Sequence, residues 1–473
     1  MPNEAVKRAG WRNVFLRRDV DMTRGGIAGN MIRFAVPLLL GNFLQQLYNL
    51  TDTWVIGQME DSAAYAAVGN IGPVINILIG FFLGFSTGAG VVISQYYGKK
   101  DYRGVHDAVH TTVAATLVMA LIFTALGVAM TPLILRVMLH VDPSDPETLV
   151  VYPHAVRYLT IYFFGVSGLL LYNISSGILR AVGDSIRPFI FLCISAVSNI
   201  LLDFLFVFGF QWGVTGVALA TVIAQAASAV FAVTVLLRAK NCVKVTLRDI
   251  RIDRKILGKI FRVGLPAAVQ TSLTAFSNVF VQSYISGTNG IQKINMSSWT
   301  TYSKVDGIIF LPLQSLALAA TTFVGQNLGA GDPERARKGT HVAYLMAVGC
   351  TLAVIIPVEF FCPYIAEFFQ SDPDVVAGAT LLLRVLSPFY LFSCVNQVYN
   401  GAMRGAGDST PPMIIMLTAF VLLRQIYLFV MTHYISNDLL PVGLGYPFGW
   451  FMCMIMTLIY YNFFFKYTKK KVV

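Results

Sequence analysis

Apolar residues occur along this chain in long runs that are broken by glycine, proline and clusters of charge. A transmembrane helix needs about 20 predominantly apolar residues, and twelve of the runs are long enough. The breaks predict helices at about 31–57, 64–97, 107–137, 152–182, 187–210, 214–237, 256–286, 295–328, 336–364, 376–406, 411–436 and 442–466. The pattern therefore predicts an all-α integral membrane protein with twelve transmembrane helices.

The composition supports the membrane class and excludes others. Of 473 residues, 56% are apolar and only 12% are charged, too few charges to cover a soluble fold of this size. The net charge of +11 could indicate nucleic-acid binding, but that function requires a solvated basic face, and here the basic residues separate apolar runs. We therefore expect membrane lipids, and no nucleic acid, around this chain.

Lysine and arginine are distributed unevenly between the loops, and this predicts the orientation. Most of the 35 basic residues fall in the N-terminal tail, in every second loop, in the segment 238–255 and at the C-terminus. The opposite loops carry acids such as Asp142, Glu147 and Asp372. The positive-inside rule then places both termini in the cytoplasm of a multi-pass protein of the cell (inner or plasma) membrane.

A motif occurs twice and divides the chain into two halves. Gly177-x-x-Arg180-x-x-Gly183-Asp184-Ser185 reappears as Gly401-x-x-Arg404-x-x-Gly407-Asp408-Ser409, and Gln95-x-x-Gly98-x-x-Asp101 reappears as Gln326-x-x-Gly329-x-x-Asp332. We predict a tail (1–30), a six-helix lobe (31–237), a cytoplasmic linker (238–255), a second six-helix lobe (256–466) and a basic tail (467–473). Because six is even, the two lobes are expected to be related by a pseudo-two-fold axis along the membrane normal.

The Gly-Asp-Ser motifs themselves are expected to be structural. Gly183 and Gly407 suit the left-handed residue that ends a helix, and the following Asp or Ser suits the cap of the next helix. Parallel repeats of this size fit a transporter whose two lobes rock around a central cavity. No catalytic constellation stands out, so we expect no enzyme and no cofactor, and we expect a monomer.

Two acids lie in predicted spans of the N-terminal half. An ionisable residue at membrane depth costs at least about 2.5–3.5 kcal/mol, so Asp52 and Asp203 each require an explanation. Asn199 lies four residues before Asp203, on the same helix face, and Thr221 lies in the next span. These four residues offer oxygen ligands for Na⁺ or a carboxylate that binds a proton. The alternatives are an interfacial Asp52 and an Asp203 that only fixes helix packing.

Further polar and aromatic residues suit the wall of a substrate cavity. Gln45 and Tyr48 share a helix face with Asp52, and Tyr158 and Asn173 are polar positions of the fourth span. Such a wall fits a large, partly aromatic ligand, although packing or interfacial roles are the alternative. The C-terminal half carries Lys304, Asp306 and Arg424 within its spans, to which we assign no role. Lys304 and Asp306 point to different faces, so a direct ion pair between them is not expected. The alternatives for these two are pairing with other helices or lining a polar cavity, and those for Arg424 are extension to the membrane surface or pairing.

These residues resemble the multidrug and toxic compound extrusion (MATE) family. The resemblance rests on Pro37 with Asp52 fifteen residues later, on Asn199-x-x-x-Asp203, on the run from Gly213 to Thr221, and on the paired Gly-Asp-Ser motifs. It implies a cation-coupled exporter with two six-helix lobes, most similar to the DinF-like branch, whose coupling site lies in the N-terminal lobe. On that pattern Asp52, Asn199, Asp203 and Thr221 match the proton or Na⁺ site, and Gln45, Tyr48, Tyr158 and Asn173 resemble cavity residues.

The sequence departs from the NorM-like branch of the family. That branch has a Glu in the seventh helix and an Asp in the tenth, where this chain has Thr274 and Ser393. A Na⁺ site in the C-terminal lobe is therefore not expected.

The working hypothesis is antiport of organic, cationic and aromatic compounds against H⁺ or Na⁺. The ion neutralises Asp52 and Asp203, and Pro37 allows the first helix to bend, because proline removes a backbone hydrogen bond. The alternative is a flippase for lipids or lipid-linked sugars, as in related two-lobe exporters. The sequence leaves open the substrate, the coupling ion, the stoichiometry and the conformational state.

Overall fold

The computed structural model describes residues 20–57, 62–138 and 146–467. Within these ranges the chain is helical and contains no strand. The N-terminal lobe consists of α2 (Ile27–Gly57), α3 (Ser62–Gly98), α4 (Tyr102–Met138), α5 (Pro146–Ala181), α6 (Ile186–Asp203), its π-helical extension η1 (Phe204–Gly209), and α7 (Gly213–Leu237). The six expected helices of this half are all present, and each begins and ends within a few residues of the prediction, apart from those ends that lie outside the described residues.

The C-terminal lobe is also built from six helical segments, several of them interrupted. It consists of α8 (Arg254–Ser286), α9 (Gln292–Gly329), α10 (Pro333–Phe369), α11 (Pro373–Leu386), η3 (Ser387–Phe389), α12 (Tyr390–Gly405), α13 (Thr410–Leu417), η4 (Thr418–Leu423), α14 (Arg424–Val430), η5 (Met431–Ile435), α15 (Leu439–Gly443), α16 (Gly445–Ile459) and η6 (Tyr460–Phe464). The expected continuous helix 376–406 is wrong in this respect: a 3₁₀ turn at Ser387–Phe389 divides it, because Pro388 cannot donate a backbone hydrogen bond.

Eleven helical segments of the described chain are long and apolar enough to cross a membrane. The remaining long helix, α8, has 33 residues but carries polar side chains along its middle, among them Gln270, Thr274 and Ser277. Large apolar residues are exposed around the molecule, such as Leu121 at 74% and Phe360 at 76%. Exposed apolar area of this extent suits a surface that faces lipid.

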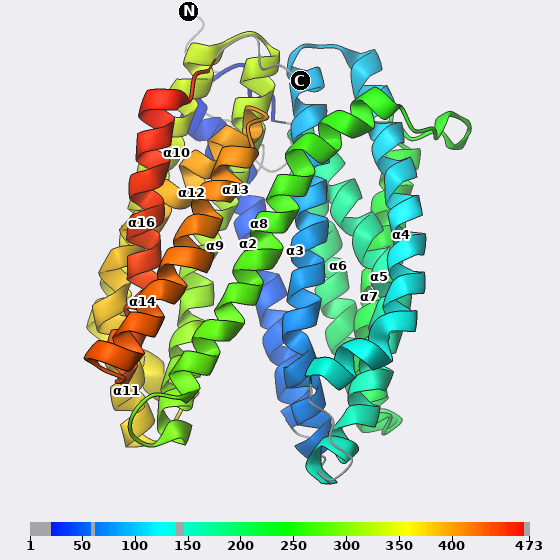
Figure 1. The fold of residues 1–473 in the computed structure, drawn as a ribbon. Coiled ribbons are helices and arrows are strands. Elements are labelled where there is room, and N and C mark those ends of the chain that lie inside the picture. The colour runs from blue at the N-terminus through cyan, green and yellow to red at the C-terminus, as the bar shows by residue number, and fades with distance from the viewer. Residues whose placement is uncertain (1–19, 58–61, 139–145, 468–473) are drawn as a thin grey trace, which may run out of the picture.

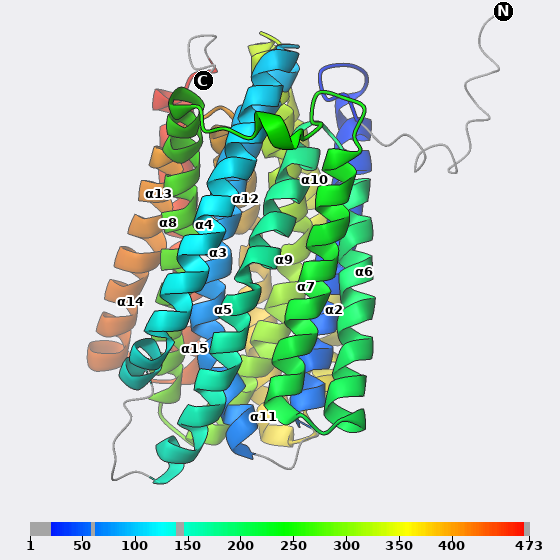
Figure 2. The same cartoon turned by 90° about the vertical axis from the view of Figure 1, so that its right-hand side faces the viewer.

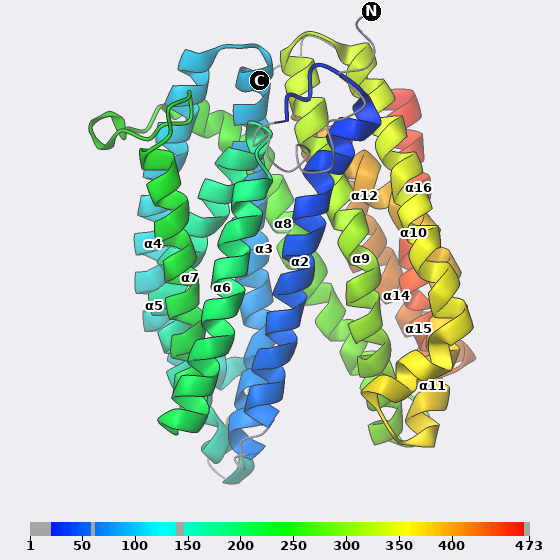
Figure 3. The same cartoon turned by 180° about the vertical axis from the view of Figure 1, so that it is seen from behind.

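Figures 1 and 3 show two bundles of helices side by side, which lie closest at the end that holds residue 467 and the linker and diverge toward the other end. Figure 2 shows the N-terminal lobe in front, with α4, α5, α7 and α6 across its width. Each lobe begins with a helix that crosses to the other lobe: the first part of α2 packs on α9 and α10, and α8 packs on α3. The two lobes are thus joined by equivalent helices, as the sequence repeat predicts.

The repeated Gln and Gly residues form a contact between the lobes, which we call the inter-lobe clasp (Gln95, Gly98, Gln326 and Gly329). Gln95 Nε2 donates to the Gly405 carbonyl at 3.0 Å, and Gln326 Nε2 donates to the Ala181 carbonyl at 2.8 Å. A Cβ atom on Gly98 would lie 1.9 Å from the Gln326 carbonyl oxygen, and one on Gly329 would lie 2.1 Å from that of Gln95. Glycine is therefore required at both positions for the two helices to approach.

The end of the predicted N-terminal tail belongs to this contact. Met22 is fully buried, and its backbone N–H donates to Gln326 Oε1 at 3.2 Å. The Val20 N–H donates to the Gly183 carbonyl at 3.1 Å. The boundary at residue 30 is thus wrong, since α2 begins at Ile27 and residues 20–26 pack against both lobes, while residues 1–19 lie outside the described chain.

The paired Gly-Asp-Ser motifs have the expected structural role. Gly183 and Gly407 have φ of 94° and 84°, the left-handed conformation that ends α5 and α12. Asp184 Oδ1 accepts from the Arg187 N–H at 3.1 Å, at the first turn of α6. Sequence reasoning therefore identified both the turn and the reason for its glycine.

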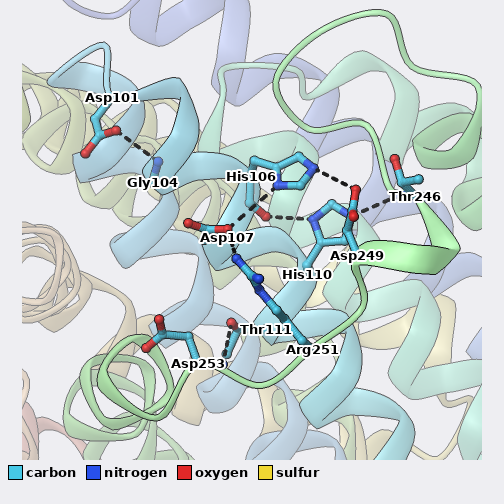
Figure 4. A network of polar contacts seen from close by, with 10 residues as sticks. All are labelled: Asp101, Gly104, His106, Asp107, His110, Thr111, Thr246, Asp249, Arg251 and Asp253. Atoms are coloured by element: carbon cyan, nitrogen blue, oxygen red, sulfur yellow. Dashed lines mark hydrogen bonds and ion pairs between the residues drawn. The ribbon is translucent and has the colours of Figure 1, made fainter.

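The linker folds back onto α4 before α8 begins, as Figure 4 shows. His110 is buried; its Nδ1–H donates to the His106 carbonyl at 2.7 Å, and its Nε2 accepts from the Thr246 N–H at 2.9 Å. Asp253 caps α8: the N–H groups of Ile256 and Lys255 bind its carboxylate and hold the pKa of Asp253 below its usual range. The linker is thus an ordered connection that ends at residue 253, two residues earlier than predicted.

Candidate functional site

Asp52 and Asp203 lie next to each other although they are far apart in sequence. Asp52 lies in the second half of α2 and Asp203 is the last residue of α6, two helices that pack along each other in the N-terminal lobe (Figure 3). The two carboxyl groups interact directly, and Asp52 also interacts with Asn199. Trp54 and Phe204, which follow the two acids, have ring centroids 6.2 Å apart and hold the helices together here. We call Asp52 and Asp203 the acidic pair.

The acidic pair and the neighbouring Asn199 have too few hydrogen-bond partners for their buried polar atoms. Asp203 and Asn199 are 0% and 2% exposed. Both carboxylate oxygens of Asp203, both amide atoms of Asn199 and Oδ1 of Asp52 are buried without a well-formed hydrogen bond within the described chain. A buried polar atom without a partner costs about 1–3 kcal/mol. Several such atoms at one place indicate that a proton, a cation or water is the missing partner.

Thr221 and Tyr158 lie beside the acidic pair. The hydroxyl of Thr221 in α7 donates to the Val217 carbonyl at 3.0 Å, so its lone pairs remain available to a ligand. Tyr158 of α5 is 6% exposed and lies within interaction distance of Thr221 and of both acids. Four helices of the N-terminal lobe therefore converge on one polar centre.

The other predicted cavity residues divide into two groups. Tyr48 lies near Asp52 and near Gln45, which is one turn earlier on the same face of α2. Asn173 does not join them. Its side-chain N–H donates to the Leu169 carbonyl at 2.9 Å, and its backbone carbonyl accepts from Ser86 Oγ at 2.9 Å. None of the described contacts of Asn173 is with the acidic pair, because its position in α5 is four turns beyond that of Tyr158.

A π-helical segment starts directly after Asp203, which sequence reasoning did not predict. The segment η1 (Phe204–Gly209) adds one residue to the turn and ends in the aromatic group Phe206, Phe210 and Trp212. Single π turns inside α-helices occur frequently at functional sites. A run of aromatic residues was the only signal available, and it does not specify this geometry.

Pro37 lies inside the continuous helix α2, within the part that packs on the C-terminal lobe and about four turns before Asp52. The helix contacts the C-terminal lobe through Met31, Phe34 and Leu38, and further along it carries Asp52 against α6. Proline removes one hydrogen bond of the helix. A bend at this position would therefore change how the acidic pair sits relative to the other lobe.

The chemistry available at the acidic pair is ion binding. Two carboxylates side by side in a medium of low dielectric constant repel each other, and a proton or a cation relieves the repulsion. Oxygen ligands from Asp52, Asp203, Asn199 and Thr221 are the type that hard cations prefer. The pair therefore suits the binding of a proton or a cation.

A second polar cavity, which we call the C-lobe chamber, lies in the C-terminal lobe. It has a volume of about 240 Å³ and is lined by Thr274, Asn278, Asp306, Phe310, Gln314, Ser393, Asn396, Gln397, Met416, Phe420, Arg424, Tyr446 and Trp450. It includes Thr274 and Ser393, the two positions at which the sequence departs from the NorM-like pattern. Sequence reasoning offered a polar cavity as one alternative for Lys304 and Asp306 but did not identify this chamber, because its lining comes from five of the six helical segments of the lobe and shares no motif.

The three charges without an assigned role have different surroundings. Lys304 is exposed and lies over the Phe369 ring, with Nζ 5.5 Å from its centroid. Asp306 accepts a hydrogen bond from the Tyr390 hydroxyl, and the described chain contains no ion pair between Lys304 and Asp306, as expected. Arg424 is 2% exposed and therefore does not extend to the membrane surface.

Comparison with known proteins agrees with this architecture. The MatE family matches residues 37–205 and 266–430, which is more than half of the chain and one segment in each lobe. The chain belongs to the MATE family. The MATE family consists of membrane transporters, which agrees with the expectation that this chain is not an enzyme. That this chain falls in the DinF-like branch stays a prediction.

Relatives and solved structures extend over nearly the whole chain. Probable multidrug resistance protein YpnP of Bacillus subtilis (strain 168) is 27% identical over 443 residues, covering 94% of this chain and 96% of the relative. Probable multidrug resistance protein YoeA of the same organism is 29% identical over 447 residues, covering 92% and 94%. A MOP superfamily transporter from Pyrococcus furiosus has the same fold, with a TM-score of 0.86 at 23% identity, covering 94% of this chain and 97% of that one. This MATE protein is thus a multi-pass membrane transporter with two lobes.

Proposed function

We propose that this MATE protein is a multidrug exporter of the plasma membrane that exchanges organic, cationic and aromatic compounds for H⁺ or Na⁺. The observation that carries the proposal is the acidic pair, two carboxylates from separate helices that meet without sufficient hydrogen bonds in a membrane-spanning lobe. Relatives named as multidrug resistance and multidrug export proteins support the substrate class. We expect the protein to act as a monomer in lipid and without a cofactor.

The orientation follows from the charges. The connection between α3 and α4, where Lys99, Lys100 and Arg103 occur, lies at the end of the molecule where the lobes are in contact, together with the linker. The positive-inside rule assigns this end to the cytoplasm. The lobes then diverge toward the outside (Figure 3), which corresponds to an outward-facing state.

In that state an external cation or proton reaches the acidic pair and neutralises it. The substrate loses the negative charge that held it and leaves to the outside. The Pro37 bend then accompanies the rearrangement of α2 between the lobes. Release of the ion inside restores the negative pair, which attracts the next cationic substrate. The available energy is about 2.3 kcal/mol per charge per 100 mV, plus about 1.4 kcal/mol per unit of pH gradient for a proton.

The test is efflux of a cationic dye, ethidium, from proteoliposomes in which sodium and pH gradients are imposed separately. Efflux driven by one gradient identifies the coupling ion. Efflux that responds to neither gradient contradicts antiport. The flippase alternative predicts movement of a fluorescent lipid between leaflets in the same vesicles, with no dye efflux.

A further inference from the structure

We infer that the C-lobe chamber is a binding site for a zwitterionic compound, whose anionic group pairs with Arg424 and whose cationic group pairs with Asp306. The inference goes beyond the proposed function, because it concerns the C-terminal lobe and not the acidic pair. It rests on two opposite charges that line one cavity, a buried Arg424 and a half-buried Asp306, and that have no ionic partner in the described chain.

Arg424 is the first of these charges. Its Nη2 donates to Ser277 Oγ at 2.8 Å and to Asn278 Oδ1 at 2.9 Å, and both acceptors are neutral. Its Nε is buried with no hydrogen-bond partner. The guanidinium carbon lies 5.0 Å from the Tyr446 ring centroid, and this contact fixes the plane of the group. A guanidinium that is 2% exposed and bound only by neutral groups favours an anion, which it can bind through two N–H groups at once.

Asp306 is the second charge, on α9 at another side of the chamber. The Tyr390 hydroxyl donates to Asp306, and the Tyr302 and Tyr390 hydroxyls lie 3.2 Å apart, so the carboxyl group is held in place by phenols. Phenols hold the position of a carboxylate but do not cancel its charge. Asp306 therefore favours a cationic group on a ligand in the chamber.

The two charges act on the same space without forming an ion pair. Both line the chamber, and Tyr446 interacts electrostatically with both of them. Asp306 and Arg424 form no ion pair with each other in the described chain, in contrast to Arg187 and Asp184, whose charged atoms lie 3.1 Å apart. A cation alone would meet repulsion from Arg424, and an anion alone would meet repulsion from Asp306. Only a ligand with both charges is attracted by both groups.

The rest of the wall indicates what surrounds the charged end of the ligand. Phe310 and Trp450 lie in contact, with ring centroids 5.8 Å apart, and Gln314 and Gln397 add amide groups. A cavity of about 240 Å³ is at the small end of ligand pockets. The chamber therefore fits the charged end of a ligand, and its aromatic residues suit an apolar ring attached to it.

The experiment compares three fluorescent probes that share one dansyl group and one chain length. Nε-dansyl-lysine carries an ammonium and a carboxylate, dansylcadaverine lacks the carboxylate, and 6-(dansylamino)hexanoic acid lacks the ammonium. Binding of each probe is titrated to the full chain in lipid nanodiscs. We expect the zwitterion to bind at least tenfold more tightly than either singly charged probe.

Single variants then assign the charges to residues. Asp306→Asn is expected to reduce the affinity for the zwitterion to that for the carboxylate probe, because the ammonium loses its partner. Arg424→Gln is expected to reduce it to that for the cationic probe. Asp374→Asn and Arg254→Gln remove the same charges from exposed positions and are expected to leave all three affinities unchanged.

Three probes that bind with equal affinity to the unmodified protein would overturn the inference without any variant. Variants that fold but keep the preference for the zwitterion would also overturn it. If Arg424→Gln fails to fold, Arg424→Lys, which retains the charge, is measured in its place. This variant should still bind the zwitterion more tightly than either singly charged probe. These measurements report binding to the chamber and not transport. Their outcome is therefore independent of the dye-efflux test of the acidic pair.

Discussion

At the level of single residues, the acidic pair is the feature on which the proposed function rests. Two carboxylates in apolar runs are expensive, and the structure places them in contact, with Asp203 at 0% exposure. The alternative in which Asp52 sits apart at the interface does not fit this contact. Whether the pair binds an ion stays a prediction, which substitutions can test.

Asp52→Asn is expected to abolish coupled export while the protein remains folded. The amide keeps the shape of the side chain and removes the charge that attracts the coupling ion. A hydrogen bond to a charged group contributes about 1.5–3 kcal/mol, so the apparent affinity for the ion should fall about 10–100-fold. Dye efflux from proteoliposomes at several ion concentrations measures this. Export by the variant at the unmodified level would refute the assignment, and Asp374→Asn is the control.

Asp203→Asn distinguishes an ion site from a packing role. If Asp203 only fixed the packing of α6, its loss would destabilise the protein. Both its oxygens lack hydrogen bonds and a second carboxylate lies beside it, so removing its charge relieves repulsion. We expect the midpoint of thermal unfolding in detergent to stay the same or rise while ion-driven export is lost. A clear fall in the midpoint would favour the packing role.

At the scale of the helices, interruptions occur next to the charged residues. The π segment η1 follows Asp203, and the π segment η4 precedes Arg424. Apolar periodicity predicted where helices lie, but it did not predict these irregular turns, since each is a short segment inside a longer apolar run. The division of 376–406 by Pro388 was missed for a similar reason: proline interrupts some membrane helices and is accommodated in others, as Pro37 is in α2.

Pro37→Ala is expected to slow export without loss of stability. In a helix interior, proline is about 3 kcal/mol less favourable than alanine, so the variant should have an equal or higher thermal midpoint and a more rigid α2. Dye efflux and thermal unfolding are the measurements. Pro132→Ala in α4 is the control, since it removes a proline from a helix that carries neither acid. Normal efflux in Pro37→Ala would exclude the hinge.

For the whole molecule, the inter-lobe clasp is one of the contacts that join the lobes, at the end that holds the linker. It uses the same two residue types twice, Gln95 with Gly98 and Gln326 with Gly329, each amide reaching the other lobe. Symmetric contacts of this kind suit a state that must open and close as a unit. The contact lies far from the acidic pair, so it can be tested separately.

Gly98→Leu is expected to force the lobes apart at this end, because even a Cβ atom would lie 1.9 Å from the Gln326 carbonyl oxygen. Spin labels at positions 103 and 338, on exposed residues of the two lobes, should give longer distances than in the unmodified protein. Gly349→Leu is the control, because no atom lies within 4 Å of the added Cβ. Unchanged label distances in a folded Gly98→Leu variant would contradict the role of the clasp.

The sequence by itself determined the membrane class, the two six-helix lobes, the Gly183 and Gly407 turns and the presence of two acids within apolar helices of one lobe. It could do so because membrane insertion depends on local apolar length and charge, and helix ends depend on local backbone conformation. Only the tertiary structure decided that Asp52 meets Asp203, that Asn173 does not join them, that residues 20–26 pack between the lobes, and that Asp306 and Arg424 share a chamber. These contacts join residues from different helices, and their rotation and approach are set by packing that no single helix specifies.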